Sequence, residues 1–131
     1  MVSSIVSLMQ SKPDFYALQG ATDSEIENAE HTLGTQFALG YRDYVSALGV
    51  ASLAGHEFTG ICKPKRLNVV DVTIEQRMIN PKIPEDWYVI EETHIDGIII
   101  WQSPKGEIFQ ACSDNYVKKI YKSLEELISK L

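Results

Sequence analysis

Apolar residues recur at helical spacing in a segment that begins near residue 22. Its apolar positions, three and four residues apart, are Ile26, Ala29 and Leu33. Such spacing places these side chains on one face of a helix. Thr22 and Glu25 precede this face at the spacing of a capping box, and Gly34 follows it where a left-handed residue often ends a helix. The pattern predicts a helix between Thr22 and Gly34.

A second helix is predicted directly after the first. Its apolar face consists of Tyr41, Tyr44, Val45 and Leu48, and Gly49 follows at its end. The short connection between the two segments indicates a helical hairpin. Because each helix has one apolar face, this hairpin must pack on another part of the chain.

Further helices are indicated at the N-terminus and in the middle of the chain. Residues 1–10 are helix-like and stop before Pro13. Residues 67–80 are ambiguous, because their β-branched residues favour a strand while Val70, Ile74 and Met78 keep a helical spacing. We expect mainly helix here, after an Asn68 cap, whereas residues 57–61 alternate as a strand does.

The apolar period changes to two after residue 86. Strands are predicted at 87–92, 97–102 and 107–112, followed by an edge segment at 116–121 and a terminal helix at 123–131. The run Ile98–Trp101 is apolar on both faces, which suits a central strand. We therefore predict one α+β domain over residues 1–131, with a mostly antiparallel sheet of about four to six strands and helices packed against it.

The helical hairpin also resembles the signature of the Smi1/Knr4 (SUKH) superfamily. The matching residues are Glu30, Leu33, Gly34, Phe37, Tyr41, Arg42, Tyr44, Val45 and Gly49. Ala38 stands where the family usually has proline, and Leu48 where it often has asparagine. The resemblance implies a compact α+β domain without a catalytic site. Many bacterial members resemble immunity proteins that neutralise a cognate toxin, often a nuclease, and fungal relatives resemble scaffold proteins.

The charge of the chain favours a basic partner. The net charge is −6, and residues 85–96 carry five acidic residues without a lysine or arginine. A protein that grips a nucleic-acid backbone needs a concentrated positive groove, and the lysine clusters here are short. We therefore expect no direct nucleic-acid binding. An acidic protein is instead steered toward a basic one, such as the cleft of a nuclease toxin.

The expected partner-binding residues combine carboxylates with an aromatic side chain. They are Glu57, Glu85, Asp86, Trp87, Glu91, Glu92 and Asp96. The carboxylates would face basic toxin residues, and Trp87, Tyr88 or Trp101 would be an aromatic anchor. Alternatively Trp87 and Trp101 belong to the core, and we expect this for at least one of them. The competing hypothesis for function is a scaffold or regulatory module with housekeeping partners.

No catalytic chemistry is indicated by the remaining polar residues. His31, His56 and His94 lack metal-ligand spacing, and the segment 112–114 offers a cysteine nucleophile without a surrounding motif. We expect no catalytic residue, cofactor or metal ion. A hydrolase would need a pocket that holds His56 or His94.

The cysteines and the lengths of the apolar runs indicate the cellular compartment of the protein. A bridge between Cys62 and Cys112 is possible, but two free thiols in a reducing cytoplasm are expected. No apolar run approaches the roughly 18 residues of a membrane span. We predict a cytoplasmic protein without a membrane partner, as a monomer or weak dimer.

Overall fold

The computed structural model describes residues 4–112 and 116–131 of the chain. The helices are α1 (Ser4–Gln10), α2 (Asp23–Leu33), α3 (Leu39–Leu48), α4 (Val69–Ile79) and α5 (Leu124–Ser129), with a 3-10 turn η1 (Lys65–Leu67). The strands are β1 (Tyr16–Ala17), β2 (Ala51–Leu53), β3 (His56–Glu57), β4 (Tyr88–Glu92), β5 (Ile99–Gln102), β6 (Ile108–Ala111) and β7 (Val117–Tyr121). The predicted first helix, residues 1–10, includes residues 1–3, and the segment 112–114 includes residues 113 and 114. Residues 1–3 and 113–115 lie outside the part of the chain that the structure describes.

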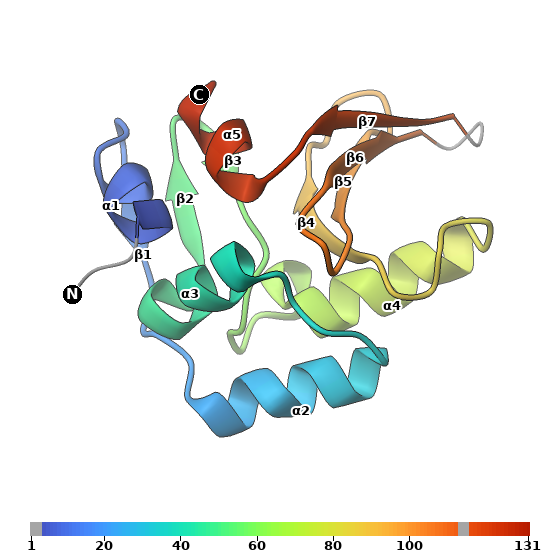
Figure 1. Cartoon of the computed structure of the whole chain (residues 1–131), viewed down its shortest axis with the longest axis horizontal. Helices are drawn as coiled ribbons and strands as arrows, with labels where there is room; N and C mark the ends of the chain where they lie inside the picture. The colour runs from blue at the N-terminus through green and yellow to red at the C-terminus, as the bar shows by residue number, and fades with distance from the viewer. Residues whose placement is uncertain (1–3, 113–115) are drawn as a thin grey trace.

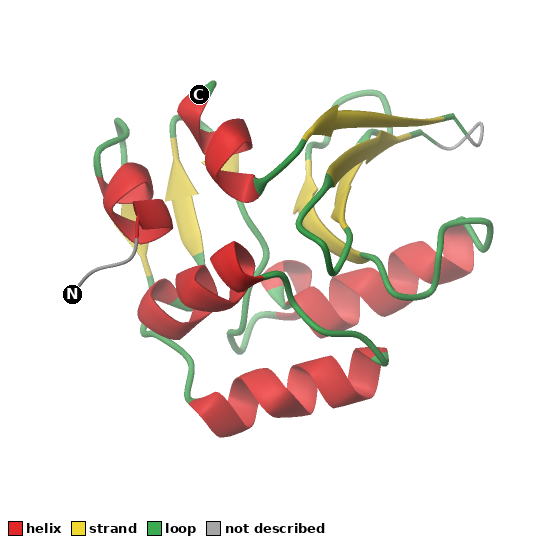
Figure 2. Cartoon of the chain, in the orientation of Figure 1, coloured by secondary structure: helices red, strands yellow, loops and turns green. Residues whose placement is uncertain are grey.

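The strands form two antiparallel sheets, one with the order β1-β2-β3 and one with the order β4-β5-β6-β7. Figure 1 shows the smaller sheet beside α1 and the larger one above α4, with α2 and α3 in the lower half of the molecule. The same division of helices and strands is seen in Figure 2. The predicted α+β class is confirmed, although the strands form two sheets where a single one was expected. The pairing of β1 with β2 was not predicted, because strands of two and three residues are too short to show a period of two.

The predicted helical hairpin is confirmed in α2 and α3. The Thr22 hydroxyl accepts a hydrogen bond from the Glu25 amide (3.1 Å), and the Glu25 carboxylate accepts one from the Thr22 amide (2.9 Å). Gly34 ends α2 in the left-handed region, with φ 67°. The four apolar residues predicted for the second helix are all buried in α3.

The helix expected within residues 67–80 is confirmed as α4 (Val69–Ile79), which follows an Asn68 cap. The Asn68 side chain accepts a hydrogen bond from the Val70 amide (2.9 Å). At the other end of the chain, the Ser123 hydroxyl caps α5 by accepting a bond from the Glu126 amide (3.1 Å). In both helices the cap decides where the element begins, because it satisfies an amide that the helix itself leaves free.

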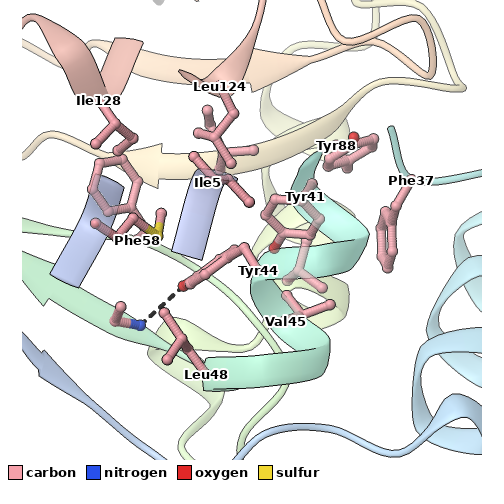
Figure 3. Close-up of a cluster of buried hydrophobic side chains, with 14 of the residues drawn as sticks. Ile5, Phe37, Tyr41, Tyr44, Val45, Leu48, Phe58, Tyr88, Leu124 and Ile128 are labelled. Atoms are coloured by element: carbon pink, nitrogen blue, oxygen red, sulfur yellow. Dashed lines mark hydrogen bonds between the residues drawn. The ribbon is translucent and has the colours of Figure 1, made fainter. Parts of the chain in front are cut away.

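The core lies on both faces of the larger sheet. One face, with Tyr88, Ile90 and Ile100, joins a large cluster that includes residues of α1, α2, α3, α5 and the smaller sheet. Figure 3 shows part of this cluster around Tyr41 and Tyr44. The opposite face packs Val89 and Trp101 against α4. The interior strand β5 is thus buried on both sides, as its apolar run indicated, and Trp101 is confirmed as a core residue.

Candidate functional site

The residues of the family motif hold the hairpin together. The carboxylate of Glu30, in α2, accepts one hydrogen bond from the Phe37 amide (2.8 Å) and another from Nη1 of Arg42 (2.8 Å). It thereby fixes the connection between α2 and α3. A half-buried ion pair that also satisfies a backbone amide explains why a glutamate stands at this position. These residues stabilise the fold at the turn between the two helices.

A second polar group at the centre of the core consists of buried tyrosines. The Tyr88 hydroxyl accepts a hydrogen bond from the Ala38 amide (2.8 Å) and donates one to Oε1 of Gln102 (2.8 Å). Burial raises the pKa of Tyr41, Tyr44 and Tyr88 above the usual value of a phenol. These hydroxyls therefore stay protonated and act as structural hydrogen-bonding groups.

The predicted partner-binding residues do not form one surface. Glu85 and Asp86 are exposed in the loop before β4, whereas Asp96 is exposed in the turn after this strand. The length of β4 separates the two groups. Trp87 is half-buried, and its ring stacks on that of Phe109, with the centroids 3.8 Å apart and the planes 15° from parallel. Trp87 is therefore partly a packing residue.

Glu91 must be removed from the predicted set of surface carboxylates. This residue is 6% exposed, and its carboxylate lies 2.7 Å from Nδ1 of His56. Glu92 is directed differently, because its carboxylate accepts a hydrogen bond from the Gln76 side chain of α4 (3.1 Å). The burial of Glu91 reflects the close packing of β3 beside β4, which the sequence of β4 alone does not reveal.

Glu57 remains exposed but is not free of partners. Both of its carboxylate oxygens accept hydrogen bonds from the Arg66 guanidinium, each at 3.0 Å. These bonds lower the pKa of Glu57 below the usual value of a carboxyl group. A basic partner would have to compete with Arg66 for this carboxylate.

We expect the two neighbouring carboxylates Glu91 and Glu57 to affect stability with opposite dependence on pH. Burial raises the pKa of Glu91 above its ordinary value of 4.5, although His56 and the nearby His94 oppose this shift. The native protein then binds this proton more tightly than the unfolded chain does, so the stabilisation is present at low pH and is lost as the pH rises through the native pKa. A Glu91→Gln variant should therefore gain stability relative to the wild type as the pH rises from about 4 to 7.

Glu57→Gln is the matched comparison for this prediction. The native pKa of Glu57 is lowered, so its contribution is present above the ordinary carboxyl pKa and is lost as the pH falls. Urea unfolding at a series of pH values measures both variants. Equal pH profiles for Glu91→Gln and the wild type would contradict the raised pKa of Glu91.

Asp86 contributes to an acidic hollow that the sequence pattern did not reveal. Together with Glu27 and Glu30 of α2, it lines a depression of about 620 Å³. The Thr35 hydroxyl donates a hydrogen bond to the Asp86 carbonyl oxygen (2.6 Å) and holds the loop against the end of α2. Residues about 60 apart in sequence meet here only through the fold.

A larger groove, of about 740 Å³, lies between the start of α2 and the segment 61–71. Its lining is mixed, with Ala29 and Ile61 among the apolar residues and Lys63 and Asp71 among the charged ones. Cys62 also lines it, and burial raises the pKa of this thiol, which keeps it protonated. Both cysteines are free thiols, as expected. Within residues 4–112 and 116–131, no group of three or more His, Cys, Asp or Glu side chains is placed to hold a metal ion.

Comparison with known proteins identifies the family. The family model SUKH_5, described as SMI1-KNR4 cell-wall, matches residues 2–131. A search of curated proteins found no significant match. Among the described residues, no helix has the length and apolar character needed to cross a membrane. The match covers nearly the whole chain and agrees with the motif between Glu30 and Gly49, so the protein belongs to the SMI1-KNR4 family of the SUKH superfamily.

Proposed function

We propose that this protein is a non-enzymatic binding protein that neutralises a cognate toxin by covering its active site. The observation that carries the proposal is the surplus of exposed carboxylates. Glu85, Asp86 and Asp96 are exposed, and none of them takes part in the ion pairs found among the described residues. Family membership supports the same role, since many SUKH proteins resemble immunity proteins.

The chemistry of a nuclease makes it the favoured class of toxin. An enzyme that binds phosphate groups carries basic residues around its cleft, and an acidic protein with a net charge of −6 is attracted to them. Such attraction raises the rate of association and guides the inhibitor to the cleft. The two free thiols, Cys62 and Cys112, suit a reducing cytoplasm, where an incoming nuclease would act.

The decisive experiment is to purify the tagged protein from its native host and to test each stoichiometric partner for toxicity. A single basic partner that kills cells, and does so only without co-expression of this chain, is the expected result. A set of sub-stoichiometric housekeeping proteins, none of them toxic, would instead identify a scaffold or regulatory module. Hydrolysis by the purified chain alone would contradict both functions.

The electrostatic part of the proposal predicts the effect of reversing two charges. Glu85→Lys combined with Asp86→Lys should slow association with the purified toxin by about tenfold at low salt, and this difference should shrink in about 0.5 M salt. Surface plasmon resonance over a salt series measures both effects. Asp23→Lys, at the far end of α2, is the control for a change of net charge and should have the smaller effect. An association rate indifferent to salt and to these substitutions would contradict electrostatic steering.

A further inference from the structure

Helix α4 carries large apolar side chains on the side that faces solvent. Its inward side packs Val69 and Val72 into the core. On the outward side Ile74, Met78 and Ile79 are 42%, 79% and 60% exposed. A surface helix normally turns its apolar residues toward the core and its polar residues toward solvent. The outward side of α4 departs from this rule, because three large apolar side chains stay exposed among the residues that the structure describes.

Two carboxylates are interleaved with these apolar residues. Asp71 and Glu75 precede Ile74 and Met78 by three residues each, so all four lie on one face of the helix. Both acids are exposed, and neither belongs to an ion pair among the residues described. The arginine of the same helix does not neutralise them, because Arg77 donates hydrogen bonds to the carbonyl oxygens of Leu33 (3.0 Å) and Trp87 (3.1 Å).

We propose that this surface, the α4 face (Asp71, Ile74, Glu75, Met78 and Ile79), binds a basic region of the toxin. The inference rests on the proposed function and adds the surface that performs it. An apolar centre with charged groups around it is the usual composition of a protein interface, and the flexible methionine adapts well to a partner. The carboxylates require positive charge on the opposing surface.

The same charges exclude two other occupants. A nucleic acid would be repelled by Asp71 and Glu75. In a symmetric dimer formed through this face, both copies would bring two carboxylates and no basic side chain of the face to the interface, which is unfavourable. A basic protein is the partner that satisfies both the apolar and the acidic residues.

The α4 face continues into the groove beside α2. Asp71 belongs to both, because it lines the groove of about 740 Å³ together with Asn68 and Val70. A toxin bound on α4 could therefore insert a side chain or loop into this groove. Figure 1 shows α4 between the larger sheet and the region of α2. Stable interfaces bury about 800 Å² on each partner, so a single helix face needs such an extension.

Met78→Glu tests the α4 face, with Leu39→Glu as its matched control. Leu39, in α3, is 75% exposed, nearly the same as Met78 at 79%, and its substitution makes the same chemical change on another surface. The probe is the purified toxin identified by the rescue experiment. We expect Met78→Glu to raise the Kd by more than about tenfold and to abolish rescue in cells, whereas Leu39→Glu stays within about twofold of the wild type.

Met78→Ala and Glu75→Lys complete the test. Both should weaken binding, the first by removing the apolar contact alone and the second by opposing a basic partner. Circular dichroism confirms that each variant is folded. Wild-type affinity of Met78→Glu, or an equal loss in Leu39→Glu, would overturn the α4 face while toxin neutralisation stands. If the wild-type protein rescues cells from none of its partners, the proposed function and the proposal for the α4 face are both overturned.

Discussion

Replacing Gly49 with alanine should lower the free energy of unfolding by about 4 kcal/mol or more, a large part of the roughly 5–15 kcal/mol that stabilises a typical domain. Gly49 ends α3 with φ 69° and ψ −72°, a conformation that side chains with a Cβ rarely adopt. An alanine Cβ here would also overlap the carbonyl oxygen of Gln19 and lie 3.3 Å from that of Ile61. Both neighbours are backbone atoms, so relieving the overlap requires movement of a whole segment.

Gly34→Ala separates the two causes of this effect. Gly34 also has a positive φ, of 67°, but an added Cβ would meet no atom within 4 Å. Its substitution should therefore cost only the backbone strain, about 1 kcal/mol. Urea unfolding of the two variants provides the comparison. Similar midpoints for Gly49→Ala and Gly34→Ala would contradict the tight approach of the chain at Gly49.

Both glycines were predicted from the sequence to end helices, and both do so. The signal is local, because a helix needs a residue at its end that tolerates a left-handed or otherwise unusual conformation. The two glycines differ in their tertiary contacts. Gly49 lies against the backbone at Gln19, thirty residues earlier in the chain, and nothing in the sequence around either glycine distinguishes their surroundings.

The same distinction explains which parts of the fold were predictable. The caps at Thr22, Asn68 and Ser123 act within four residues of their own helix, so their spacing is visible in the sequence. The strands β1 and β2 gain their pairing from contacts far away in sequence. Their few residues carry no periodic pattern, and the division into two sheets could not be foreseen.

The candidate site was less predictable than the fold for a related reason. The acidic residues between 85 and 96 are close in sequence, which suggested a common surface. A strand in their middle separates the two ends, and Glu91 is buried by His56, a residue 35 positions earlier. Conversely, Asp86 meets Glu27 across the fold. A charge pattern predicts the sign of a partner but not the surface that it contacts.

Replacing Tyr44 with phenylalanine should lower the free energy of unfolding by about 3 kcal/mol, although only one oxygen atom is removed. The Tyr44 hydroxyl accepts a hydrogen bond from the Ala51 amide (2.9 Å), drawn in Figure 3, and donates one to the Thr59 carbonyl oxygen (2.9 Å). All three residues are buried. Without the hydroxyl, a donor and an acceptor of the backbone are left unsatisfied, which costs more than the loss of an ordinary hydrogen bond.

Tyr41→Phe is the matched control for Tyr44→Phe, since Tyr41 is equally buried on the same helix. The hydroxyls of Tyr41 and Thr59 lie 3.0 Å apart, and that of Thr59 donates to the Val89 carbonyl oxygen (2.7 Å). Tyr41 must then be the donor to Thr59, and its loss leaves only a spare acceptor position on a hydroxyl. The expected cost is about 1 kcal/mol, measured by the same urea titration. Equal destabilisation by the two variants would contradict the added cost of leaving the Ala51 amide and the Thr59 carbonyl oxygen unsatisfied.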